Sequence, residues 1–128
     1  MSQVQREYEK ALMVFRERLV EKLGDRVESI VVYGSVARGE AIEDSDIDVL
    51  IVGTDKEIGN TVLEIGYDVD YENSFETFIT PICFTKEELE ERVKAGSPFV
   101  HEILEDGVAL HDDGTFKRVR EKVLGASG

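Results

Sequence analysis

The segments Gly34-Ser35-Val36-Ala37-Arg38-Gly39 and Ser45-Asp46-Ile47-Asp48 decide the fold, because each joins an apolar run to a polar turn. The first segment follows Ile30-Val31-Val32-Tyr33, a β-branched run that ends at a glycine and is typical of a buried strand. The second leads directly into Val49-Leu50-Ile51-Val52, another apolar run. The sequence therefore predicts two buried strands with a glycine-containing turn and an acidic stretch between them.

The Gly-Ser turn has the composition of a phosphate-binding turn. Gly34 can adopt backbone angles that are closed to other residues, and it lets a ligand approach the chain closely. Ser35 adds a hydroxyl beside backbone N–H groups at the start of a short helix. Phosphate oxygens suit such a set of donors.

The two aspartates after this turn are predicted to act together. Side chains alternate between the faces of a strand, so Asp46 and Asp48 point the same way, roughly 6 to 7 Å apart along the chain. Two carboxylates held in this way repel each other unless a cation lies between them. Magnesium prefers carboxylate oxygens together with substrate phosphates, and the neighbouring turn would position those phosphates.

Each half of this motif also has an ordinary interpretation. The Gly-Ser and Arg-Gly pairs occur in surface turns, and Glu43-Asp44-Ser45-Asp46 taken alone would be a solvated acidic loop. The short spacing between the two halves, with a strand on each side, favours a nucleotide and metal site instead.

At these residues the chain resembles the minimal nucleotidyltransferases of the DNA polymerase beta superfamily. Their signature is a Gly-Ser, an Arg-Gly a few residues later, and an Asp-x-Asp that opens a strand. The resemblance extends from Val27 to the segment that ends at Leu110. It implies the palm-like nucleotidyltransferase fold, an α/β (α+β) domain with a small mixed sheet and helices packed mainly on one face.

The chain is expected to form a single nucleotidyltransferase domain over residues 1–128. Apolar residues recur every three or four positions near the start of the chain, which predicts an N-terminal helix over 2–23. The motif-bearing core spans 27–112, and a C-terminal helix is expected over 115–124. Within the core, the patterns predict a helix over 56–67, a strand over 75–84, helices over 86–94 and 98–105, and a short strand over 108–110.

The resemblance also implies a mechanism. Asp46 and Asp48 would bind two Mg²⁺ ions that bridge a nucleoside triphosphate, while Gly34 and Ser35 hold its outer phosphates. An acceptor hydroxyl would then attack the α-phosphorus and receive a nucleoside monophosphate, with AMP from ATP as the favoured donor pair.

Arg38 and Gly39 have less specific roles. Arg38 either offsets the charge that develops on the leaving pyrophosphate or braces the acidic loop through Glu40 or Asp44. Gly39 lets the loop turn.

A third carboxylate is expected on the strand that follows the Asp-x-Asp strand in this family. Here that strand is predicted over 75–84, and its only acid is Glu76, which becomes the candidate third metal ligand and catalytic residue. Asp70 and Glu72 fall in the preceding connection, where ligand geometry is harder to hold. The alternative for Glu76 is a solvated glutamate near the start of a strand.

The composition narrows the partners and the compartment. The chain has 28 acidic and 15 basic residues and a formal charge of -13, which argues against nonspecific nucleic-acid binding. No apolar run approaches the ~20 residues needed to cross a membrane. The start of the chain is unlike a secretion signal, so a cytoplasmic location is expected. Cys83 is the single cysteine and is expected to be a small buried hydrophobic residue.

The family resemblance implies a protein acceptor. Many minimal members act as antitoxins beside a small helical toxin of the HEPN type, and some adenylate a tyrosine of that partner. Two alternatives remain open: a catalytically weak nucleotide-binding antitoxin that acts by contact, and a transferase that modifies a small, antibiotic-like molecule. The sequence does not decide whether the chain forms a homo-oligomer.

Overall fold

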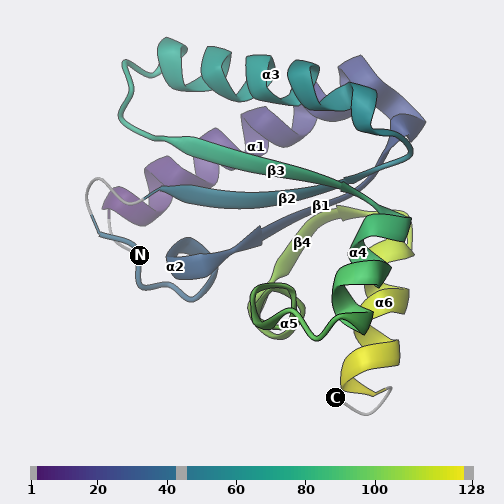
Figure 1. The fold of residues 1–128 in the computed structure, drawn as a ribbon. Coiled ribbons are helices and arrows are strands. Elements are labelled where there is room, and N and C mark those ends of the chain that lie inside the picture. Colours follow the sequence, from purple (N-terminus) through teal and green to yellow (C-terminus); the bar gives the residue numbers. More distant parts are fainter. Residues whose placement is uncertain (1–2, 43–45, 126–128) are drawn as a thin grey trace.

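A computed structural model of the chain describes residues 3–42 and 46–125, which form one four-stranded mixed sheet covered by helices (Figure 1). The strands are β1 (Val27–Tyr33), β2 (Ile47–Gly53), β3 (Ile79–Thr85) and β4 (Val108–Asp112). The α-helices in these ranges are α1 (Gln3–Leu23), α2 (Gly34–Ala37), α3 (Gly59–Glu72), α4 (Lys86–Lys94), α5 (Pro98–Asp106) and α6 (Thr115–Leu124). Two 3₁₀ turns, η1 (Gly24–Arg26) and η2 (Lys56–Ile58), complete the described elements.

The strand order is β3-β2-β1-β4, which places the two motif-bearing strands at the centre of the sheet. β1 runs antiparallel to both of its neighbours, whereas β2 and β3 are parallel and are connected through α3. In the antiparallel register Tyr33 pairs with Asp48, and in the parallel register Asp48 pairs with Thr80. The end of β1, the start of β2 and the start of β3 therefore lie side by side at the same end of the sheet.

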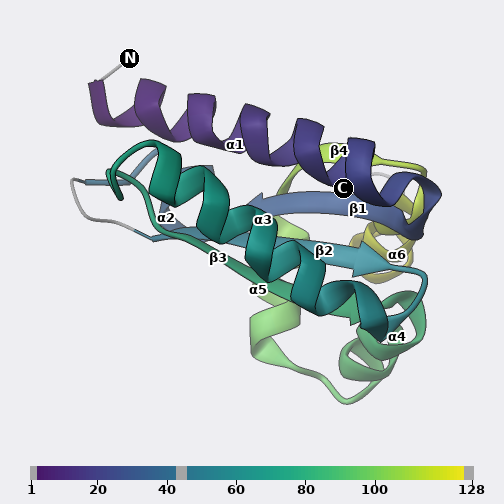
Figure 2. The same ribbon diagram turned by 90° about the horizontal axis from the view of Figure 1, so that it is seen from above.

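One face of the sheet is covered by α1 and α3, which run side by side (Figure 2). Tyr8, Phe15 and Leu19 project from α1 at helical spacing and are at most 1% exposed. They pack with Val62 and Val69 of α3 on the strands below. Burying each such apolar side chain contributes about 1.5–3 kcal/mol, so this face holds much of the core.

The opposite face is covered by α4, α5 and α6, whose buried residues pack on Val31, Leu50 and Val52. The carboxylate of Asp112 at the end of β4 fixes α6 in place. It accepts a hydrogen bond from the buried Ser29 hydroxyl at 2.8 Å and another from the Phe116 N–H at 3.2 Å. The expectation of a mixed sheet is confirmed, but helices cover both faces of the sheet rather than mainly one.

The predicted starts of the helices α4 and α5 are confirmed. Thr85 and Glu88 form a reciprocal capping box at the start of α4. Ser97 accepts a hydrogen bond from the Val100 N–H at the start of α5, and Pro98 is the first helical residue.

The segment between α3 and β3 differs from its prediction. The helix continues to Glu72, and the strand begins at Ile79 rather than at residue 75. The physical reason is Asp70, a buried residue whose carboxylate accepts hydrogen bonds from the Thr77 hydroxyl at 2.7 Å and the Ile79 N–H at 2.9 Å. These bonds hold residues 73–78 in a turn.

No helix in the described part of the chain is long and apolar enough to cross a membrane. Cys83 lies in β3, is partly buried and packs against the core, as expected. Burial raises the pKa of its thiol to about 11. Because the thiolate is the reactive form, Cys83 is predicted to be inert in the folded protein.

We expect Cys83 to react with iodoacetamide at least about tenfold more slowly in the native protein than in urea, at about pH 8, because the unfolded thiol returns to its ordinary pKa of about 8.5. Mass spectrometry of the alkylated chain measures both rates. Equal rates in the two states would contradict the burial of this residue.

Candidate functional site

The predicted turn and the second aspartate line one hollow on the face of the sheet covered by α5. Gly34 begins α2 directly after β1, and Asp48 is the second residue of β2. α2 and α5 border this region below the sheet in Figure 1. The hollow has a volume of about 360 Å³, within the usual range for small-ligand sites. Its lining residues are Tyr33, Gly34, Ser35, Arg38, Asp48, Phe99, Glu102 and Ile103.

Gly34 and the Asp48 carboxylate are in direct contact. Gly34 has a φ of 76°, in the left-handed region that favours glycine. A Cβ atom at this position would lie 2.5 Å from Asp48 Oδ2, so a side chain here would force the carboxylate or the turn to move. Gly34 is therefore required both for the backbone conformation of the turn and for the position of the carboxylate.

The Asp48 carboxylate is held from its other side by β3. Its Oδ1 atom accepts a hydrogen bond from the Thr80 hydroxyl at 3.1 Å, and the same hydroxyl lies 3.2 Å from the carbonyl oxygen of Ile47. Burial raises the pKa of Asp48, and the negative charge of Asp46 raises it further. The Thr80 hydrogen bond and the charge of Arg38 act in the opposite direction.

Asp46 lies just before β2 and is exposed, and its charge raises the pKa of Asp48. The pair supplies carboxylate oxygens, which are the donors that Mg²⁺ prefers. The chemistry of these two residues therefore fits the metal that the family resemblance implies. In residues 3–42 and 46–125, no group of three or more acidic, histidine or cysteine side chains is arranged to hold a metal ion.

Arg38 points to acidic residues around the hollow. Its guanidinium forms an ion pair with Glu40 at 3.0 Å and longer ones with Glu102 at 3.4 Å and Asp106 at 3.9 Å on α5. Of the two roles considered for Arg38, this geometry shows the bracing contact with Glu40. Asp44, the other acid considered, lies outside the described residues.

Gly39 adopts a φ of 72°, as a turning residue requires, and open space surrounds the position of its missing Cβ. It is thus a glycine of the same conformation as Gly34 without the carboxylate contact.

Glu76 is not placed beside the aspartates. The prediction that it lies on the strand is wrong, because β3 begins at Ile79 and Glu76 belongs to the turn that Asp70 holds. Its backbone N–H donates to the Asn73 side chain at 3.1 Å. Its side chain lines a separate hollow of about 370 Å³ between α1 and α3, on the opposite face of the sheet from the α5 hollow.

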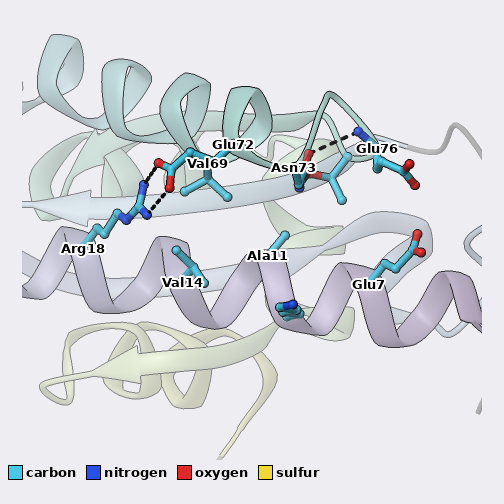
Figure 3. A pocket seen from close by; sticks show the side chains of 10 residues that line it. Glu7, Ala11, Val14, Arg18, Val69, Glu72, Asn73 and Glu76 are labelled. Atoms are coloured by element: carbon cyan, nitrogen blue, oxygen red, sulfur yellow. Dashed lines mark hydrogen bonds and ion pairs between the residues drawn. The ribbon is translucent and has the colours of Figure 1, made fainter.

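Figure 3 shows Glu76 near Glu7 at one end of this second hollow and the ion pair between Arg18 and Glu72 at the other. Asp70 and Glu72, the other acids near the predicted strand, are also engaged elsewhere. Asp70 holds the turn, and the Glu72 carboxylate accepts hydrogen bonds from both terminal guanidinium nitrogens of Arg18. The position opposite Asp48 on β3 is occupied by Thr80.

The structure adds residues that no sequence motif marked: Tyr33 and Phe99, which line the hollow, and Thr80, which holds Asp48 from β3. Tyr33 and Phe99 form an edge-to-face ring pair with centroids 5.6 Å apart. Burial raises the pKa of the Tyr33 hydroxyl to about 12, with a further contribution from Asp48, so the phenol stays protonated. The role of Thr80 is revealed only by the register between β2 and β3.

The sequence profile of the nucleotidyltransferase domain family matches residues 12–110, which include the whole turn and both aspartates. Two proteins of Methanocaldococcus jannaschii that carry the name protein adenylyltransferase are similar in sequence. One is 49% identical over 45 residues, a stretch that spans 35% of this chain and 45% of the relative's length. The other is 29% identical over 119 residues, covering 85% of this chain and 76% of the relative.

Solved structures share the fold. A mutant of the MntA-HpeT toxin-antitoxin superposes with a TM-score of 0.56 at 13% identity, covering 88% of this chain and 82% of that one. A toxin-antitoxin structure with AMP-PNP gives 0.56 at 14% identity, with coverage of 88% and 84%. A Sulfolobus solfataricus protein named as a nucleotidyltransferase gives 0.52 at 24% identity, with coverage of 86% and 85%.

Gly34→Ala is expected to destabilise the protein more than Gly39→Ala. Both variants pay about 1–2 kcal/mol for a non-glycine residue at positive φ, but only the Gly34 variant must also displace the Asp48 carboxylate, which adds about 1–3 kcal/mol. Urea unfolding of the two variants measures the difference. Equal losses would contradict the contact between Gly34 and Asp48.

Proposed function

The chain belongs to the nucleotidyltransferase domain family, and on that premise we propose that it transfers AMP from ATP to a hydroxyl group of a partner protein. The observation that carries the proposal is the seating of the Asp48 carboxylate against Gly34, in a hollow that Ser35 also lines. This arrangement brings a candidate metal ligand and a candidate phosphate-binding turn to one place.

The names of the similar proteins support the choice of nucleotide and acceptor. Both Methanocaldococcus jannaschii relatives are named for adenylyl transfer to protein, and one structural neighbour is a toxin-antitoxin with AMP-PNP. The charge of this chain, -13, also disfavours a nucleic-acid acceptor. We propose a small helical protein of the HEPN type as the partner, following the family resemblance.

We assign the roles as follows. The backbone of Gly34 and the hydroxyl of Ser35 bind the outer phosphates of the nucleotide, and Asp46 and Asp48 hold magnesium. Two bound Mg²⁺ ions would neutralise the triphosphate and make its α-phosphorus more electrophilic. Thr80 keeps the Asp48 carboxylate in position through its hydrogen bond.

The electrostatics of the site make the cation indispensable in this proposal. Asp48 and Glu102 line the hollow, and the charge of Asp46 acts on Asp48. Arg38, the one lining cation in the described residues, is already paired with Glu40 and Glu102. A triphosphate that entered without cations would meet a negative field. Nucleotide binding is therefore expected to require a divalent cation.

The acceptor hydroxyl must lose a proton as its oxygen forms a bond to the α-phosphorus and pyrophosphate departs. A third carboxylate would serve as the base, but in the described part of the chain Thr80 occupies the position opposite Asp48 on β3. We therefore assign the proton to solvent or to a base on the partner.

The position of Thr80 also favours a second candidate function. A chain without a third carboxylate beside Asp48 would bind the nucleotide and act on its partner by contact alone. In that case Asp48→Asn would still suppress the activity of the partner, whereas a transferase would lose suppression together with transfer.

Asp48→Asn is expected to lower magnesium-dependent transfer of labelled AMP at least about a hundredfold, because the uncharged amide is a poor ligand for Mg²⁺. The test incubates the chain with labelled ATP, Mg²⁺ and the product of the neighbouring gene. Asp55→Asn is the matched control, since Asp55 is exposed and pairs with Arg26 away from the hollow. Absence of magnesium-dependent nucleotide binding by the wild type would contradict the whole site.

Variants of Thr80, which lies opposite Asp48, and of Glu76, the predicted third carboxylate, are expected to differ in their effect on transfer. Thr80→Ala removes the hydrogen bond to Asp48 and is expected to reduce transfer about tenfold, within the range for supporting contacts to metal ligands. Glu76→Gln should leave transfer within about twofold, because surface substitutions away from a site have small effects. Both effects are measured as steady-state rates of labelled AMP transfer. A large loss of transfer in Glu76→Gln would indicate that Glu76 is the third carboxylate after all.

A further inference from the structure

Four aromatic side chains lie together on the surface, and none of them lines the nucleotide hollow. They are 40% to 65% exposed, although they are large and apolar. Their rings touch in sequence, with centroid separations of 5.7 Å to 6.4 Å. We call this cluster the aromatic ladder; its members are Tyr67, Tyr71, Phe75 and Phe78.

The aromatic ladder continues an exposed stripe of α3. Leu63, which is 55% exposed, precedes Tyr67 and Tyr71 at steps of four residues, so the three share one flank of the helix. Val69 and Glu72 face α1 across the second hollow, and Figure 2 shows α1 beside α3 on that side. The stripe therefore lies on the flank of α3 that turns away from α1.

The turn after α3 holds the rest of the aromatic ladder in place. Ser74 and Phe75 have φ values of 61° and 57°, a conformation that is costly for residues other than glycine. The Phe75 N–H donates to the carbonyl oxygen of Asp70 at 2.7 Å, while the Asp70 carboxylate binds Thr77 and Ile79. A strained turn held by buried hydrogen bonds thus presents a phenylalanine to solvent.

Continuous exposed aromatic surface of this kind is typical of a protein interface, where tyrosines often dominate the binding energy. The charges beside it indicate which partner fits. Glu64 and Asp68 are exposed on α3 and each follows a stripe residue in sequence, and the whole chain carries -13. A second copy of this chain would bring the same negative charge to the contact, so a basic partner is favoured.

We propose that the aromatic ladder is the docking surface for a basic partner protein, which places an amphipathic helix along α3. The end of the ladder adjoins the nucleotide site, because the Phe78 carbonyl accepts the Ile47 N–H at 2.8 Å and Ile47 lies between the two aspartates. A partner docked there reaches the edge of the proposed active site. The identification of this partner as the acceptor rests on the proposed function; the docking surface itself does not.

The test uses a synthetic amphipathic peptide as long as α3, with leucine along one face, lysine elsewhere and one tryptophan. The chain has no tryptophan, so the fluorescence of the peptide reports binding directly. The variant Tyr67→Ser/Tyr71→Ser is expected to bind the peptide at least about tenfold more weakly than the wild type. Met13→Ser/Val20→Ser, which removes exposed apolar residues of α1, is the matched control and should bind like the wild type.

Three results would overturn the docking surface. The first is equal affinity of the Tyr67→Ser/Tyr71→Ser variant and the wild type for the peptide. The second is equally tight binding of a peptide that has glutamate in place of lysine. The third is self-association of the wild type in sedimentation experiments that is absent in the variant. The experiments distinguish a failure of the docking surface from a failure of the proposed nucleotidyltransferase function. The ladder variant should keep magnesium-dependent binding of a fluorescent ATP analogue, and Asp48→Asn should keep binding the peptide.

Discussion

The contact between the Asp48 carboxylate and the backbone of Gly34 is the constraint on which the site depends. It joins the end of β1 to the start of β2, because Tyr33 and Asp48 are paired in the antiparallel register. The turn can approach the carboxylate only without a side chain at position 34. Thr80 then fixes the other oxygen of the carboxylate from β3. Three strands of one sheet thus position one functional group, which a loop alone would hold less accurately.

The same arrangement leaves the hollow without an unpaired basic side chain among its described lining residues. Arg38 is the basic residue that the motif contributes, yet acids of its own loop and of α5 engage it. In this geometry it links α2 to α5 and holds two walls of the hollow together. The negative field of the site would then be balanced mainly by what the nucleotide brings with it.

The local signals in the sequence predicted much of the fold. The run from Ile30 to Tyr33 lies in β1, and the helix predicted to begin at residue 98 is α5, which begins at Pro98. Both Gly34 and Gly39 adopt the positive φ expected of them. These predictions succeeded because short-range chemistry decides caps, turns and apolar strands.

The failures depended on contacts between residues distant in the fold. Asp70 looked like part of a loop, but its buried carboxylate sets the start of β3 and leaves Glu76 in the turn. The parallel register that brings Thr80 to Asp48 has no local signature, so the sequence could not place Thr80 in the site.

That register has a consequence for protein engineering and for evolution. Thr80 is exposed, and it already stands opposite Asp48 on the neighbouring strand. A change of this one side chain to aspartate would add a carboxylate beside the existing pair without any change in the path of the backbone. The scaffold therefore lies a single substitution away from having three carboxylates at this end of the sheet.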